Sequence, residues 1–257
     1  MKILISNDDG ILSPGLKKLI EIFRDGNEIY VLAPDRERSA VSNARIIQGS
    51  LYTEEVNLPG TKASFTSSAT PADCIKLAVH ALKIRPDIVI SGINNGQNCG
   101  VDIIYSGTVA AAMEGCLFGV PSFAVSIRNN CVTDYDACER YFRGIVERIL
   151  TKDEKAETLW NVNIPSCRRK EIKGIKLNPQ ADSRYFEEYQ GESSGKRKEW
   201  HLAKSFLDYG PADRCDWYHL LQNYISVTPL SINITDKRII NESSKCFDRM
   251  FAMEMSG

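Results

Sequence analysis

The chain has 257 residues, 43% of them hydrophobic and 25% charged, which is ordinary for a globular protein of one or two domains. Its net charge of −1 argues against a nucleic-acid polymer as a partner bound through bulk electrostatics. No apolar stretch reaches the roughly 20 residues that cross a bilayer, so we expect no membrane span. The first residues also lack the layout of a secretory signal.

The first elements predict a parallel crossover unit. Lys2-Ile3-Leu4-Ile5 is a short apolar run that is typical of a buried strand. Ser13-Pro14-Gly15 then starts a helix, with serine as the N-cap and proline at the first helical position. Ile29-Tyr30-Val31-Leu32 supplies a second buried strand. Strand, helix and parallel strand in this order are the building unit of an α/β fold.

The middle of the chain continues this alternation. Residues 46–65 contain strand-like fragments broken by Pro59-Gly60, which favours hairpins over another crossover. Thr70-Pro71 repeats the cap-then-proline pattern and opens a helix that runs to Leu82. The later predicted elements are a strand over 87–90, a helix over 109–118, a strand over 121–126, a helix over 134–150 and a strand over 160–165.

The carboxyl-terminal part is less regular. From Asn178 to about His219 the periodicity fades, and aromatic and charged residues alternate with glycines. A compact domain rarely carries so long a loop, so we expect an extended hairpin arm or a subunit contact here. Residues 225–230 are strand-like, and residues 237–253 predict a terminal helix.

The eight cysteines are scattered along the chain and form no Cys-x-x-Cys pair. This spacing argues against a zinc knuckle or a dithiol redox site. Several cysteines lie inside predicted helices, where a reduced thiol packs as a small hydrophobic group. Free thiols predict a cytoplasmic protein.

Two adjacent carboxylates, Asp8 and Asp9, follow the first predicted strand. In open α/β sheets, ligands bind beyond the carboxyl ends of the strands. Neighbouring strand residues point to opposite faces, so both acids serve one site only if the chain has turned, which Gly10 permits. Two ionised carboxylates about 5 Å apart repel by roughly 3 kcal/mol at an effective dielectric near 20. A cation, a shared proton or plain solvent must offset this repulsion. If solvent does so, the segment is an ordinary solvated turn, which is the alternative to a binding site.

Four loops at strand ends or helix starts carry side chains that offer oxygen. These are Asp8, Asp9, Ser39, Asn94, Asn98, Ser106 and Thr108. Carboxylate, amide and hydroxyl oxygens suit Mg²⁺ or Mn²⁺, whereas the three histidines lie elsewhere, which disfavours a classical zinc site. The helix start at Ser106-Gly107-Thr108 suits an anion, although an ordinary N-cap is the alternative. A divalent cation beside such a helix start favours phosphoryl chemistry.

Five motifs in order carry a resemblance to a known family. They are Asn7-Asp8-Asp9-Gly10, Ala33-Pro34-Asp35-Arg36-x-Arg38-Ser39, Thr70-Pro71-Ala72-Asp73-Cys74, Ser91-Gly92-Ile93-Asn94 and Tyr105-Ser106-Gly107-Thr108. Together they resemble the SurE family of metal-dependent survival-protein phosphatases, which act as 5′/3′-nucleotidases. The resemblance covers most of residues 1–164, and residues 225–230 resemble the family's carboxyl-terminal segment. Ala69 and Asn223 stand where the family usually has glycine.

The resemblance implies a Rossmann-like three-layer catalytic domain over residues 1–177, with a mostly parallel sheet. It implies that residues 178–257 form a β-hairpin arm and an exchanged oligomerisation segment of a homodimer or homotetramer. One divalent cation per subunit, Mg²⁺ or Mn²⁺, would be held by Asp8, Asp9, Ser39 and Asn94. The phosphate of a nucleoside monophosphate would contact Asn43, Asn98, Ser106, Gly107 and Thr108.

The hypothesis is that metal-activated water hydrolyses nucleoside 5′-monophosphates, and 3′-monophosphates as well. Asp8 or Asp9 would accept the proton of that water, and we favour Asp8. An aspartyl-phosphate route is disfavoured because Gly10 interrupts the Asp-x-Asp spacing it needs, and Ser39 has no neighbouring histidine base. A receiver-like signalling domain would need an aspartate after the third strand and a lysine after the fifth, and neither is present. A nucleotide-binding module without turnover remains open.

Overall fold

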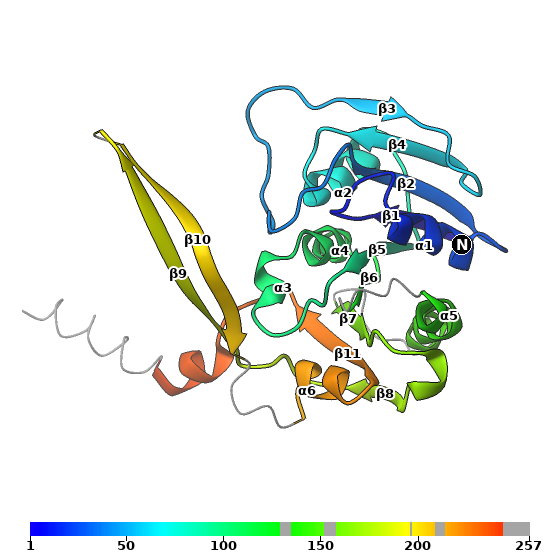
Figure 1. Ribbon diagram of the computed structural model, residues 1–257. Helices are drawn as coiled ribbons and strands as arrows, with labels where there is room; N and C mark the ends of the chain where they lie inside the picture. The colour runs from blue at the N-terminus through cyan, green and yellow to red at the C-terminus, as the bar shows by residue number, and fades with distance from the viewer. Residues whose placement is uncertain (129–134, 152–157, 196, 209–213, 244–257) are drawn as a thin grey trace, which may run out of the picture.

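A nine-stranded, mostly parallel sheet organises the body of the protein (Figure 1). The computed structural model describes residues 1–128, 135–151, 158–195, 197–208 and 214–243. The strands, in their order across the sheet, are β3 (Thr53–Glu55), β4 (Ala63–Ser67), β2 (Glu28–Pro34), β1 (Lys2–Ser6), β5 (Ile88–Asn95), β6 (Ser122–Ile127), β7 (Thr158–Ile164), β11 (Tyr224–Ser231) and β8 (Gly174–Leu177). β3 runs antiparallel to β4, β11 runs antiparallel to β7, and the other neighbours are parallel.

Helices cover both faces of this sheet, so the fold has three layers (Figure 1). The helix α1 (Pro14–Phe23) lies with α5 (Asp136–Leu150) on one face, and α2 (Pro71–His80) lies with α4 (Gly107–Leu117) on the other. Alternation along β1 explains why both faces are apolar. Ile3 and Ile5 enter the core with α1 and α5, whereas Leu4 enters the core with α2. The predicted Rossmann-like three-layer α/β fold is confirmed.

Local capping signals place the helices where the sequence predicts them. Ser13 accepts a hydrogen bond from the Leu16 backbone N–H at 3.3 Å, and Thr70 accepts one from Asp73 at 3.1 Å. Residues 46–65 hold the predicted hairpin, β3–β4, but β4 also pairs in parallel with β2. The strand β5 continues past its predicted end, because its pairing with β6 shifts register between Ser91 and Asn94 and then resumes. Residue 134, the predicted start of α5, lies outside the described residues.

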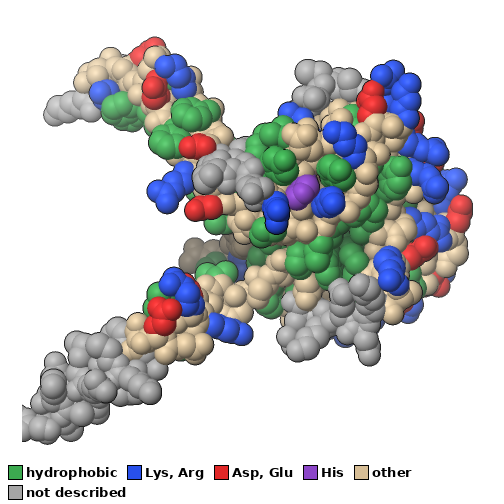
Figure 2. All heavy atoms as spheres, turned by 90° about the horizontal axis from the view of Figure 1, so that it is seen from below, with side chains coloured by type: hydrophobic (Ala, Val, Ile, Leu, Met, Phe, Trp, Pro, Cys, Tyr) green, Lys and Arg blue, Asp and Glu red, His purple; other side chains and the backbone are tan. Residues whose placement is uncertain are grey.

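The carboxyl-terminal part divides between the sheet and a projecting arm. β9 (Arg184–Ser194) and β10 (Arg197–Asp208) form the predicted hairpin arm, a two-stranded antiparallel sheet separate from the main one. Figure 2 shows the arm extending from the body with hydrophobic side chains on its surface. The strand β11 returns to the main sheet after the short helix α6 (Asp216–Leu221). Residues 237–243 are helical, and the rest of the predicted terminal helix lies outside the described residues.

The two departures from the family pattern fit their local backbone. Asn223 precedes β11 with a φ of +63°, a left-handed conformation that glycine adopts freely and asparagine tolerates. Ala69 is fully buried before α2, and its backbone N–H donates to the Ser67 hydroxyl at 3.1 Å. Among the helices that the structure describes, none combines the length and the apolar character required to cross a membrane.

Candidate active site

The turn between β1 and α1 presents both adjacent carboxylates. The Asn7 side chain donates to the Gly10 carbonyl at 3.0 Å and to the Ser13 hydroxyl at 2.6 Å, and it accepts from the Gly10 N–H at 3.2 Å. Gly10 has a φ of +96°, and a Cβ there would lie 3.2 Å from the Arg36 backbone. The turn predicted at Gly10 therefore depends on both its conformation and its lack of a side chain.

A cavity of about 420 Å³ opens beside this turn at the carboxyl ends of the parallel strands. Its lining residues are Asp8, Asp9, Glu37, Ser39, Ala40, Asn94, Asn95, Gln97, Asn98, Asp102, Tyr105, Ser106 and Tyr185. The strands β1 and β5 lie side by side here. The strand order reverses between them, because β2 and β4 lie on one side of β1 while β5, β6 and β7 follow on the other. Ligands bind at such a switch point in α/β sheets. All four predicted cation ligands, Asp8, Asp9, Ser39 and Asn94, line the cavity.

Only two of the five predicted phosphate contacts are among the described residues that line the cavity. Asn98 and Ser106 line the cavity. Gly107 and Thr108 lie behind Asp8 and are buried. Asn43 is exposed in the long loop after β2 and is absent from the described lining.

The Asp8 carboxylate lies against the start of α4. The Thr108 hydroxyl donates to Asp8 Oδ1, while the Ser106 hydroxyl caps the helix by accepting from the Val109 N–H at 3.1 Å. Gly107 leaves room for this contact, because a Cβ at that position would lie 2.8 Å from Asp8 Cβ. Burial raises the pKa of Asp8, and the hydrogen bonds from Thr108 act against that shift. The start of α4 thus offsets only part of the cost of burying the ionised form of Asp8.

The environment of the Asp9 carboxyl does little to stabilise its negative charge. Burial first, then repulsion from Asp8 and from Glu37, raise the pKa of Asp9 to about 6. The metal-free protein therefore holds two carboxyls whose environments disfavour ionisation. A cation bound between them would reverse that preference.

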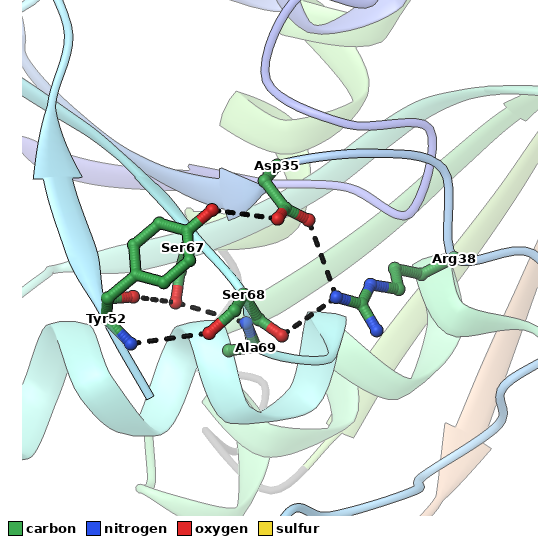
Figure 3. Close-up of polar contacts among 6 residues, drawn as sticks. All are labelled: Asp35, Arg38, Tyr52, Ser67, Ser68 and Ala69. Atoms are coloured by element: carbon green, nitrogen blue, oxygen red, sulfur yellow. Dashed lines mark hydrogen bonds and ion pairs between the residues drawn. The ribbon is translucent and has the colours of Figure 1, made fainter. Parts of the chain in front are cut away.

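The loop after β2 is fixed by Arg38 (Figure 3). Its guanidinium donates to the Ser68 carbonyl at 2.9 Å and lies 3.4 Å from Asp35 Oδ1, and the Tyr52 hydroxyl donates to Asp35 Oδ2 at 2.8 Å. The Arg38 backbone N–H also donates to the Asp8 carbonyl at 2.7 Å. These contacts hold the residues on either side of Arg38, which both line the cavity.

The loop after β5 is anchored on its far side by β7. The Asn98 backbone N–H donates to Asn163 Oδ1 at 2.8 Å, and Asn161 donates to the Asn98 carbonyl at 2.7 Å. The side chain of Asn94 donates its amide N–H to the Gly96 carbonyl at 2.7 Å. That bond orients the Asn94 amide so that its oxygen is available to a ligand.

The cavity has the charge of a cation site. Its lining contains four carboxylates, those of Asp8, Asp9, Glu37 and Asp102, and neither lysine nor arginine among the residues described. No group of three histidine, cysteine, aspartate or glutamate side chains in the described chain is arranged to hold a metal. The Ser39 hydroxyl, which donates to Glu37 at 2.7 Å, and the Asn94 amide lie in the same cavity and offer oxygen atoms in addition to the carboxylates. This mixed oxygen set fits Mg²⁺ or Mn²⁺.

Seven lining residues were not predicted as site residues: Glu37, Ala40, Asn95, Gln97, Asp102, Tyr105 and Tyr185. Glu37 lies in a loop that the sequence marks as charged, so its signal was available. Asp102 begins the short helix α3 (Asp102–Tyr105), which is too short to leave a periodic pattern. Tyr185 comes from β9, and only the tertiary structure brings the arm to the cavity.

An apolar cavity of about 580 Å³ lies between α5 and β8, away from this site. Its lining includes Tyr141, Ile145, Trp160 and Leu177, with no carboxylate among the described residues. Such a lining favours the burial of apolar surface and does not favour bond cleavage. The polar cavity at the strand ends is the better candidate for chemistry.

We expect Asp9→Asn to stabilise the metal-free protein at pH 7 by about 1–2 kcal/mol, after discounting for partial solvent exposure. Because the folded-state pKa of Asp9 is raised, its ionisation costs stability as pH rises from about 4 to about 6. This loss of stability is fully present at pH values above the pKa of Asp9 in the folded state, and it is absent at pH values below its pKa in the unfolded state. Urea unfolding with a chelator at pH 7 and pH 3.5 measures this difference.

Asp25→Asn, a change at an exposed carboxylate, is the control and should leave stability unchanged at both pH values. A gain for Asp9→Asn at pH 3.5 that equals the gain at pH 7 would show that ionisation is not the cause.

Comparison with known proteins places this arrangement in a family. The family model described as survival protein SurE matches residues 3–187. The protein named 5′-nucleotidase SurE of Thermoanaerobacter sp. (strain X514) is 37% identical over 243 residues, which are 94% of this chain and 96% of that protein. The protein of the same name from Petrotoga mobilis is 38% identical and is covered to 97%. The crystal structure of the SurE protein from Aquifex aeolicus superposes with a TM-score of 0.81 at 32% identity and covers 94% of this chain and 98% of that chain. The chain belongs to the SurE family.

Proposed function

We propose that this protein is a metal-dependent phosphomonoesterase that hydrolyses nucleoside 5′-monophosphates, and 3′-monophosphates as well, to nucleoside and phosphate. The observation that carries the proposal is the charge of the cavity, which has four carboxylates and no basic side chain among its described lining residues. A phosphomonoester dianion is repelled from such a cavity unless a cation is bound first. The two relatives named 5′-nucleotidase SurE support the hydrolysis of 5′-monophosphates.

The residues that would hold one divalent cation, Mg²⁺ or Mn²⁺, are Asp8, Asp9, Ser39 and Asn94. When bound there, the cation would lower the pKa of water and withdraw charge from a phosphoryl oxygen. The Asn98 and Ser106 side chains, which line the cavity, would orient the phosphate. Asn43, Gly107 and Thr108 remain predicted phosphate contacts.

The attacking water would give its proton to a carboxylate, and we favour Asp8 over Asp9. The Thr108 hydroxyl fixes one Asp8 oxygen, so the other is held in a defined direction. A new P–O bond forms to the water oxygen while the ester P–O bond breaks. The nucleoside oxygen leaves and takes up a proton from solvent. The negative charge on the phosphoryl oxygens would lie near the start of α4, whose partial positive charge would stabilise it.

The rival function is a nucleotide-binding module without turnover. It shares the fold and the cavity, so only a reaction separates the two. Phosphate release from a panel of nucleoside 5′- and 3′-monophosphates, with Mg²⁺ or Mn²⁺ and then with excess chelator, is the test. We expect release with either cation and a loss of at least about 100-fold on chelation. Activity that survives chelation would contradict the metal-dependent mechanism, and nucleotide binding without release would favour the rival.

We also propose that the enzyme is a cytoplasmic homodimer or homotetramer that exchanges its carboxyl-terminal segment. Six cysteines in the described chain are free thiols, which suits a reducing compartment. The arm exposes large apolar side chains, among them Phe186, Trp200 and Phe206, which suits a subunit contact. Light scattering after gel filtration measures the assembly, and a monomeric mass at micromolar concentration would contradict it.

A further inference from the structure

Two tyrosine rings contribute an aromatic, uncharged surface to the polar cavity. Tyr105 ends α3, and Tyr185 begins the arm in β9; both line the cavity. Their ring centroids lie 5.8 Å apart, with an angle of 69° between the ring planes. The two residues keep 49% and 39% of their surface exposed. An edge-to-face pair at the rim of a cavity leaves a ring face open to a flat ligand.

Apart from the edge-to-face contact between the two rings, hydrogen bonds at the hydroxyl of Tyr185 and at the backbone of Tyr105 hold the pair. The Tyr185 hydroxyl donates to the Asp102 carboxylate, and burial followed by this bond raises the pKa of Tyr185. The backbone carbonyl of Tyr105 accepts from the Ser42 N–H at 3.0 Å. These two hydrogen bonds use the hydroxyl and the backbone, so they do not compete with stacking on the ring faces that the pair leaves open.

The pair is also close to the phosphate end of the cavity. Tyr105 directly precedes Ser106, the N-cap of α4, so a ligand on Ser106 can extend toward the rings. The amide side chains of Asn95 and Gln97 line the same cavity and offer hydrogen-bond donors and acceptors to a ligand there. The lining thus combines carboxylates and amides with two aromatic rings.

We propose that Tyr105 and Tyr185 form the subsite for the base of the nucleoside monophosphate, which stacks on the exposed face of the tyrosine pair. The inference rests on the proposed function, since it takes the phosphate to lie at the carboxylate end. Stacking on an aromatic ring accepts every base, because each has a π-face, so this subsite gives a preference for nucleotides over sugar phosphates. Through Tyr185, the arm contributes to substrate selection as well as to the shape of the cavity.

The test compares adenosine 5′-monophosphate with ribose 5-phosphate, which has the same phosphate and sugar but no base. The measured quantity is the ratio of kcat/KM for the nucleotide to kcat/KM for the sugar phosphate. We expect Tyr185→Leu and Tyr105→Leu each to lower this ratio by about 5- to 160-fold, which is the range that base stacking supplies. Tyr185→Phe keeps the ring but loses the bond to Asp102, and it should retain a ratio within about threefold of the wild type.

Tyr189→Leu is the matched control. Tyr189 lies on the same strand, is 54% exposed and donates its hydroxyl to a carboxylate, that of Glu187 at 3.0 Å, yet it is not among the described lining residues. Its loss should leave the ratio unchanged. A ratio unchanged in both cavity variants, or lowered equally by the control, would overturn the base subsite. If the wild type releases phosphate from neither substrate, the proposed function is wrong and this inference falls with it.

Discussion

Asp8→Asn is expected to lower kcat for phosphate release from nucleoside monophosphates by at least about 10³-fold. The substitution keeps the shape of the side chain but removes the charge that would hold a cation and the base that would accept a proton. The residue is 4% exposed and bonded to Thr108, so the neutral amide remains in place. Steady-state phosphate release at saturating Mg²⁺ or Mn²⁺ measures the loss.

The control for this experiment is a carboxylate that carries the same change elsewhere. Asp25 is exposed in the turn after α1, and Asp25→Asn should retain wild-type kcat. Thermal denaturation of both variants shows whether they are folded. An Asp8→Asn enzyme that is folded and keeps more than a tenth of wild-type kcat would contradict the role given to Asp8.

Gly107→Ala is expected to lower kcat/KM by about 100-fold, because displacement of a reacting group by an ångström has an effect of this size. A Cβ at Gly107 would lie 2.8 Å from Asp8 Cβ, 3.0 Å from Asp8 Oδ2 and 3.1 Å from a side-chain carbon of Pro71. The carboxylate must therefore move, or α4 must shift away from it. We also expect a loss of about 1–3 kcal/mol in the free energy of unfolding, as is usual for overpacking.

Gly115→Ala separates the two effects of that substitution. Gly115 lies toward the other end of α4, and a Cβ there would lie 2.5 Å from the Ser122 hydroxyl and 2.7 Å from Val89 Cβ. It should cost a similar amount of stability while leaving kcat/KM near that of the wild type. Equal losses of kcat/KM in the two variants would mean that α4 acts through general stability and not through the position of Asp8.

Local signals in the sequence predict the elements that carry the site. Ser13 with Pro14, and Thr70 with Pro71, mark helix starts because a side-chain cap and a fixed φ act within one turn. Gly10 after two aspartates marks the turn that brings both carboxylates to one cavity. These predictions depend on interactions over a few residues, which is why sequence alone supports them.

Long-range contacts explain what the sequence did not predict. The parallel pairing of β4 with β2 joins residues separated by a long loop, and no local pattern encodes it. Tyr185 reaches the cavity only because the base of the arm lies beside α3. The family resemblance implies that Thr108 contacts phosphate. In the structure the Thr108 hydroxyl donates to the Asp8 carboxylate, a contact that no local pattern marks.

The most direct measurement for this account is the binding of Mn²⁺ to the metal-free protein, followed by electron paramagnetic resonance. The account predicts one Mn²⁺ per chain in the wild type and in Asp25→Asn, with binding lost or weakened at least about 100-fold in Asp8→Asn and Asp9→Asn. Wild-type protein that binds no Mn²⁺, or aspartate variants that bind it as tightly as the wild type, would contradict the account.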